Sequence, residues 1–125
     1  MSKLPTIAMT PMPEYGYDPI PLILSGEKKH TLRKQKMHGR KEITVGHKRT
    51  GIVLLSRGWI KMTQAEFLTD DFAAADGFRE TYVAGSPVSP RENLIMLLEH
   101  FYGDVPETMW CNHFRVVQRL EEETE

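Results

Sequence analysis

The chain has 125 residues, of which 40% are hydrophobic and 26% charged, with a net charge of −1. This length suits one domain over residues 1–125 whose core needs no metal or disulfide. Cys111 is the only cysteine, which excludes an intrachain disulfide and fits a reducing cytoplasm. No apolar run approaches the ~20 residues of a membrane span, so we expect a cytoplasmic protein without a membrane partner.

The charge is segregated along the chain. Between Gly26 and Arg49 lie nine basic and two acidic residues, a net charge of +7, whereas the remainder has seven basic and fifteen acidic residues, a net charge of −8. Such a basic segment predicts an anionic partner, RNA or a nucleotide; a solvated loop with surplus lysines is the alternative. The basic residues expected to contact the ligand are Lys28, Lys29, Arg33, Lys34, Lys36, Arg40 and Lys41.

The first third of the chain predicts an arm, a short helix and a strand. Residues 1–17 contain three prolines and no clear period, which indicates an irregular arm with at most a short strand near Tyr15–Tyr17. Asp18 then resembles a helix N-cap, with proline at the first helical position. Gly26 ends this helix, because glycine adopts left-handed backbone angles without steric cost. An extended segment follows from His30.

The middle of the chain predicts strands. Residues 34–40 are expected to form a loop, and 42–45 a short strand. The β-branched run Gly51–Leu55 indicates a buried strand. Arg57-Gly58 is expected to form a tight turn into a partner strand at Trp59–Glu66.

Two helices and a final strand are expected in the second half. Thr69 or Asp70 is expected to cap a helix that ends at Gly77, and a loop over Thr81–Pro87 follows. Ser89–Glu92 reads as a capping box that starts the next helix.

Apolar residues at positions 94, 97, 98 and 101 give this helix a buried face, and Gly103 ends it. Trp110–Leu120 alternates as a strand, and Glu121–Glu125 is expected to fray. These elements predict an α+β domain.

Two separated motifs resemble those of the ASCH domains, a branch of the PUA-like folds. The first consists of Gly26, Lys28 and the Thr31-x-Arg33 pair, and the second is the Ala75–Phe78 turn before a helix that closes in Tyr-Gly. Their order and spacing extend over about two thirds of the chain. The resemblance implies a small, mostly antiparallel β-barrel with flanking helices and a cleft between them.

The resemblance also implies candidate site residues. One bacterial ASCH group hydrolyses 4-acetylcytidine with a lysine, a threonine and a glutamate, which match Lys28, Thr31 and, approximately, Asp76. Aspartate is one methylene shorter than glutamate, and the segment after it is longer here. Other members are linked to RNA binding or RNA cleavage, so three functions remain open: a domain that binds RNA or a modified nucleoside, an amidohydrolase or ribonuclease, and a protein-interaction module.

Asp76 allows a geometric prediction. It lies at the expected C-terminal end of a helix, where the macrodipole disfavours a negative charge, so it needs a cation such as Lys28 or Arg33 within ~4 Å. Thr31 should open onto the same cavity, and burial should shift the pKa values of the pair. The alternative is a solvated turn aspartate.

The remaining polar and aromatic residues predict little chemistry. The histidines share no ligand spacing and no cysteine pair exists, so we expect no metal or other cofactor. Trp59 and Trp110 could stack bases or pack in the core.

Overall fold

The structure is a computed structural model that describes residues 3–118. The predicted fraying at 121–125 and the end of the last predicted strand, Leu120, therefore lie outside the described residues. The elements, in chain order, are β1 (Thr6–Ala8), the 3-10 helix η1 (Pro13–Tyr15), α1 (Pro19–Ser25), β2 (His30–Arg33), β3 (Arg40–Val45), β4 (Lys48–Thr63), α2 (Gln64–Phe67), α3 (Asp70–Ala75), β5 (Thr81–Val83), β6 (Ser86–Val88), α4 (Pro90–Tyr102) and β7 (Thr108–Gln118).

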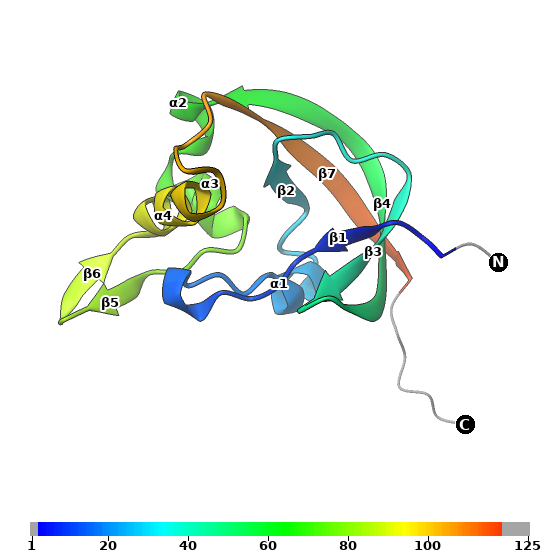
Figure 1. Cartoon of the computed structure of the whole chain (residues 1–125), viewed down its shortest axis with the longest axis horizontal. Coiled ribbons are helices and arrows are strands. Elements are labelled where there is room, and N and C mark those ends of the chain that lie inside the picture. Colours follow the sequence, from blue (N-terminus) through cyan, green and yellow to red (C-terminus); the bar gives the residue numbers. More distant parts are fainter. Residues whose placement is uncertain (1–2, 119–125) are drawn as a thin grey trace.

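The main sheet has five strands in the order β1-β3-β4-β7-β2. The β1–β3 pair is parallel and the other pairs are antiparallel. The sheet curls into a half-barrel, and Figure 1 shows α2, α3 and α4 gathered at one end of the long strands β4 and β7. The predicted α+β class with a small, mostly antiparallel, barrel-like sheet is confirmed. None of the described helices is long and apolar enough to cross a membrane.

The prediction of a turn at Arg57-Gly58 is wrong. Strand β4 runs without interruption from Lys48 to Thr63 and pairs with β7 on both sides of this position. The register shifts between Ser56 and Gly58, so Arg57 is the extra residue of a β-bulge. Glycine beside an arginine suits a bulge as well as a turn, and only the pairing with β7 decides between them.

Two further expectations also need correction. The last residues of the predicted strand 59–66 form α2 instead, because Thr63 and Glu66 make a capping box. Residues 81–87 form the hairpin β5–β6 rather than a loop. Its turn residues Ala84 and Gly85 both have positive φ, 52° and 84°, as two-residue hairpin turns require.

The N-terminal arm is more regular than expected. Its strand is β1, which pairs in parallel with β3, and not the segment Tyr15–Tyr17. That segment holds the end of η1, and Tyr17 forms isolated bridges with Met12 and Phe78. The three prolines of the arm predicted irregular structure there, and the partner strand that stabilises β1 lies more than thirty positions further along the chain.

The helix ends follow the local signals. Gly26 caps α1 with φ 87°, although Asp18 at the other end makes no side-chain capping bond. Thr69 accepts a bond from the amide of Phe72 at the start of α3. Ser89 forms the predicted capping box of α4, and Gly103 ends that helix.

The core consists of two clusters of buried apolar side chains. One joins α3 and α4 to β2 and β7 and includes Leu32, Phe78 and Leu94. The other joins α1 to β1, β3 and β4 and includes Ile23 and Ile43. The turn after α1 leads from the second cluster to the first, and this turn carries Lys28.

Candidate functional site

The turn between α1 and β2 places Lys28 inside the protein. Gly26 reverses the chain, and the amide of Lys28 donates a 2.9 Å hydrogen bond back to the carbonyl of Leu22. The Lys28 side chain is 0% exposed. Its Nζ donates to the backbone oxygen of His30 at 2.7 Å and to the backbone oxygen of Asp76 at 2.7 Å. A third bond, of 2.8 Å, goes to Asp76 Oδ1, so all three N–H donors have acceptors.

Asp76 lies at the C-cap of α3, where its amide donates to the carbonyl of Phe72 at 2.9 Å. Its side chain is 5% exposed. Oδ1 accepts from Lys28 Nζ at 2.8 Å and lies 3.1 Å from His30 Nδ1. The predicted pairing of Asp76 with Lys28 is therefore confirmed. Lys28 offsets the unfavourable helix dipole by binding both the carboxylate and a carbonyl at the helix end.

Burial and pairing both shift the titration of these groups. Burial lowers the pKa of Lys28, and the Asp76 carboxylate counteracts this. Burial alone would raise the pKa of Asp76, but Lys28 and His30 outweigh it, so that this pKa lies below its ordinary value. Asp76 is accordingly a carboxylate at neutral pH.

Strand β2 brings Thr31 and Arg33 to one side, as alternation predicts. Thr31 is 1% exposed, and its Oγ1 accepts from Arg33 Nε at 3.2 Å. Arg33 Nη2 donates to the carbonyl of Ala8 at 2.6 Å. Among residues 3–118 no carboxylate pairs with Arg33, so its charge remains available to a ligand.

Thr31, Arg33 and Asp76 line one cavity of about 580 Å³, which we call the central cavity. Within residues 3–118, no buried side-chain oxygen or nitrogen lacks a partner. Within that part of the chain Asp76 Oδ2 forms no hydrogen bond to a protein atom, so it retains a small solvent exposure, and Asp76 lines the cavity. The walls come from the N-terminal arm, β2, the turn after α3, and α4, and include Met12, Tyr17, Leu32, Phe78, Leu94, Leu97, Leu98, Phe101 and Tyr102.

The basic segment does not form one patch. Lys34 reaches the rim of the central cavity, where its Nζ lies 4.9 Å from the ring centre of Tyr102. Lys36 Nζ lies 5.1 Å from the ring centre of Trp59 and 4.6 Å from that of Trp110.

Lys29 and Arg40 are exposed and Lys41 is half-buried, the last two on β3. Neither Trp59 nor Trp110 belongs to a core cluster, and both are half-buried.

Residues of this site that sequence reasoning missed include His30 and the apolar wall of α4. The His30 ring stacks on Phe72 with centroids 4.9 Å apart, and its Nδ1 lies 3.1 Å from Asp76 Oδ1. Alternation placed His30 on the face of β2 opposite Thr31, but no local signal pairs it with an aspartate 46 positions away. The described residues contain no group of three side chains able to hold a metal ion.

Comparison with known proteins gives a structural likeness. No family model and no curated protein matches the sequence. The fold is similar to the crystal structure of protein EF3133 from Enterococcus faecalis, of the family DUF984, with a TM-score of 0.57 and 14% identity. The match covers 95% of this chain and 80% of that one. At this identity the likeness shows that the chain has the fold of that DUF984 protein.

Proposed function

We propose that this protein is an ASCH-type, PUA-like domain that binds a nucleobase, free as a modified nucleoside or within RNA, in the central cavity. One observation carries the proposal. The Asp76 carboxylate and Arg33, which has no carboxylate partner among residues 3–118, line one mostly apolar cavity of about 580 Å³, whose other polar lining residues include Glu14, Thr10 and Thr31. Small-molecule sites combine such apolar walls with a few convergent polar groups.

The chemistry of a nucleobase edge suits this arrangement. Cytosine presents an amino donor beside acceptor atoms, so Asp76 Oδ2 can accept from the amino group while Arg33 donates to an acceptor. The Thr31 hydroxyl can donate or accept. The flat faces of the base suit the apolar wall of α4, and the exposed rings of Phe101 and Tyr102 lie at the rim.

Binding can be tested by calorimetric titration with cytidine, 4-acetylcytidine, uridine and adenosine. Arg33→Gln should weaken the best ligand about 10- to 150-fold, because a hydrogen bond to a charged group contributes ~1.5–3 kcal/mol. Arg79→Gln is the matched control, since Arg79 is exposed and lies outside the cavity. Wild-type protein that binds no nucleoside, or an Arg33→Gln variant that binds like wild type, would refute the proposal.

An RNA ligand would add contacts from the basic segment. RNA affinity should then fall steeply with salt, because each neutralised phosphate releases counterions. Neutralising this segment should weaken binding for all RNA sequences; affinity that does not change with salt would contradict it. The residues to neutralise together are Lys34, Lys36, Arg40 and Lys41.

The amidohydrolase is the second candidate, because Lys28 binds Asp76 at 2.8 Å and Asp76 lines the same cavity as Thr31. The Lys28 side chain is 0% exposed, and all three N–H groups of its ammonium already donate hydrogen bonds. In this arrangement Lys28 orients Asp76, and the atom left to face a substrate water is Asp76 Oδ2. A carboxylate with a lowered pKa is a weak base, and a general base works best near the operating pH. This favours binding over catalysis.

Incubation with acylated nucleosides followed by mass analysis distinguishes the two functions. In the hydrolysis, water adds to the acyl carbon and the amide C–N bond breaks, giving a carboxylate and the free amine. If it occurs, Lys28→Ala and Thr31→Ala should each lower turnover at least ~10²-fold; the folded fraction of Lys28→Ala is measured alongside, because this substitution also breaks a buried ion pair. Protein that is inert toward every acylated nucleoside leaves only the binding function.

A further inference from the structure

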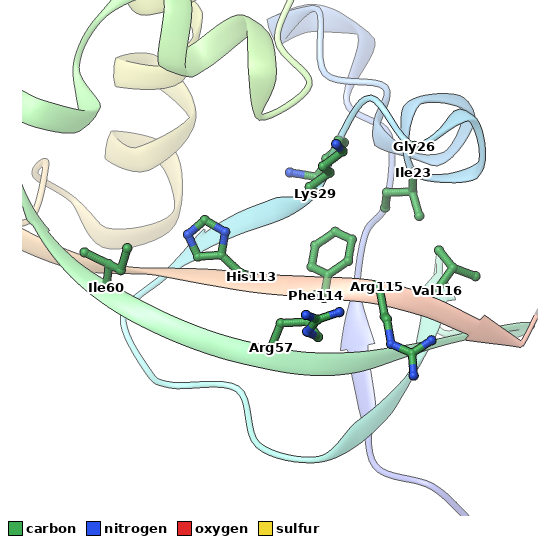
Figure 2. A pocket seen from close by; sticks show the side chains of 10 residues that line it. Ile23, Gly26, Lys29, Arg57, Ile60, His113, Phe114, Arg115 and Val116 are labelled. Atoms are coloured by element: carbon green, nitrogen blue, oxygen red, sulfur yellow. The ribbon is translucent and has the colours of Figure 1, made fainter.

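A second hollow, of about 650 Å³, lies between the α1–β2 turn and the strands β4 and β7 (Figure 2). We call it the β4–β7 groove. It shares no lining residue with the central cavity. Its lining consists of Ile23, Gly26, Lys28, Lys29, Arg57, Ile60, His113, Phe114, Arg115 and Val116.

The groove carries positive charge without compensation. Lys29, Arg57 and Arg115 are exposed and come from three different elements. Within residues 3–118 none of them forms a salt bridge or a side-chain hydrogen bond, and the lining contains no acidic residue. Lys28 adds no free charge, because Asp76 neutralises it. Three unpaired cations around one hollow contribute nothing visible to the fold, whereas they would attract an anion.

The β-bulge of β4 places one of these cations. Arg57 is the residue without a partner on β7, since Ser56 pairs with Phe114 and Gly58 with His113. Bulges often redirect a side chain next to a functional site. Figure 2 shows Lys29 on the α1–β2 turn and Arg57 at β4, while the Arg115 side chain extends from β7 away from that turn.

This spacing indicates the kind of anion. A site for a single phosphate would converge its donors on one point, but in Figure 2 Lys29, on the turn, lies apart from Arg57 and Arg115, on the strands. Between them the floor is apolar, and Ile60 is 59% exposed. His113 adds a neutral hydrogen-bonding group, because burial and the neighbouring His30 lower its pKa.

We infer that the β4–β7 groove binds the sugar-phosphate backbone of a single-stranded nucleic acid. Successive phosphates contact Lys29, Arg57 and Arg115, and the sugars and bases between them cover the apolar floor. Proteins that bind single strands without sequence preference combine a positively charged groove with aromatic side chains on which bases stack; the rings in this lining are those of His113 and the largely buried Phe114. This inference goes beyond the nucleoside cavity and does not depend on it.

The test measures fluorescence anisotropy of a labelled twelve-nucleotide oligouridine between about 50 and 200 mM salt. The variant Arg57→Gln/Arg115→Gln removes two groove cations. The matched control, Lys48→Gln/Arg79→Gln, removes two exposed cations outside the groove and thus changes net charge equally. All four side chains are exposed, so both variants should fold, and circular dichroism checks this.

The groove variant should bind at least about tenfold more weakly at the lowest salt. The slope of log affinity against log salt should become shallower by about 1.4, at ~0.7 for each phosphate contact on a single strand. The control should bind like wild type. Equal weakening in both variants, or none in the groove variant, would overturn the inference.

Measurements with competing and alternative anions identify which kind of anion the groove binds. Displacement of the oligouridine by equimolar uridine monophosphate or inorganic phosphate would show a single-phosphate site and overturn the inference. So would tighter binding of duplex RNA, or of polyglutamate, which would favour the protein-interaction module. The groove variant should still bind nucleosides, and Arg33→Gln should still bind the oligouridine, so the two proposals fail separately.

Discussion

Replacing Lys28 with methionine should destabilise the protein strongly, because it removes a cation that is fully buried. Three acceptors lose their donor: the carbonyls of His30 and Asp76 and the Asp76 carboxylate. Of these, the carboxylate matters most, since it remains buried with only His30 beside it. Breaking one half of a buried ion pair typically costs ~3–5 kcal/mol, a large share of the ~5–15 kcal/mol that stabilises an ordinary domain.

A double-mutant cycle makes this test specific. Asp76→Asn alone leaves the Lys28 ammonium without its counter-ion, whereas Lys28→Met/Asp76→Asn removes both charges. The double variant should therefore lose less free energy of unfolding than the sum of the single variants, by ~0.5–3 kcal/mol.

The assay is urea unfolding at pH 7, followed by circular dichroism. Arg49→Met is the matched control, because Arg49 pairs with Glu42 at 2.7 Å in a half-exposed position; such pairs contribute ~0.2–1 kcal/mol. A Lys28→Met variant no less stable than this control, or single variants whose losses simply add, would refute the account of the buried pair.

Three further predictions concern pH, backbone and thiol chemistry. Because the pKa of Asp76 is lower in the folded protein, its carboxylate stabilises the fold fully above the unfolded-state pKa of ~3.9, and this stabilisation is lost as the pH falls through the folded-state pKa. The free energy of unfolding, measured against pH in acid, should fall in this range in wild type and fall less in Lys28→Met. Gly16→Ala should lower the melting temperature far more than Gly46→Ala: both glycines have positive φ, but a Cβ at Gly16 would lie 2.6 Å from the carbonyl oxygen of Arg79, whereas one at Gly46 meets nothing within 4 Å; equal losses would contradict this. Burial raises the pKa of the Cys111 thiol to about 11, so alkylation at pH 8 should proceed only as fast as the protein opens, and rapid labelling of the folded protein would contradict its burial.

The local signals in the sequence were sufficient for both ends of α4 and for the C-terminal end of α1, but not for α2, which was expected to be a strand. The capping box at Ser89 and the glycines at 26 and 103 act through hydrogen bonds and backbone angles within a few residues. Such interactions do not depend on the rest of the chain, so the sequence alone determines them. The segregation of positive charge before residue 50 is likewise a property of the sequence alone.

Strand pairing depended on distant segments. Gly58 fits a turn or a bulge equally well by its own conformation, and β7 selects the bulge by pairing on both sides. The same holds for β1, whose partner β3 supplies the hydrogen bonds that its own residues cannot predict.

The site illustrates the same division. Lys28 and Asp76 could be paired only by likeness to a known fold, since nothing local connects residues 48 positions apart. The sequence supplied a lysine after a glycine turn and an acid at an expected helix end. The curled sheet determined that these two neutralise each other, that Thr31 and Arg33 open onto the central cavity, and that Arg57 joins Lys29 and Arg115 in a separate groove. Which charges meet in a folded protein depends on the packing of elements remote in the chain, and that packing is a property of the whole tertiary structure.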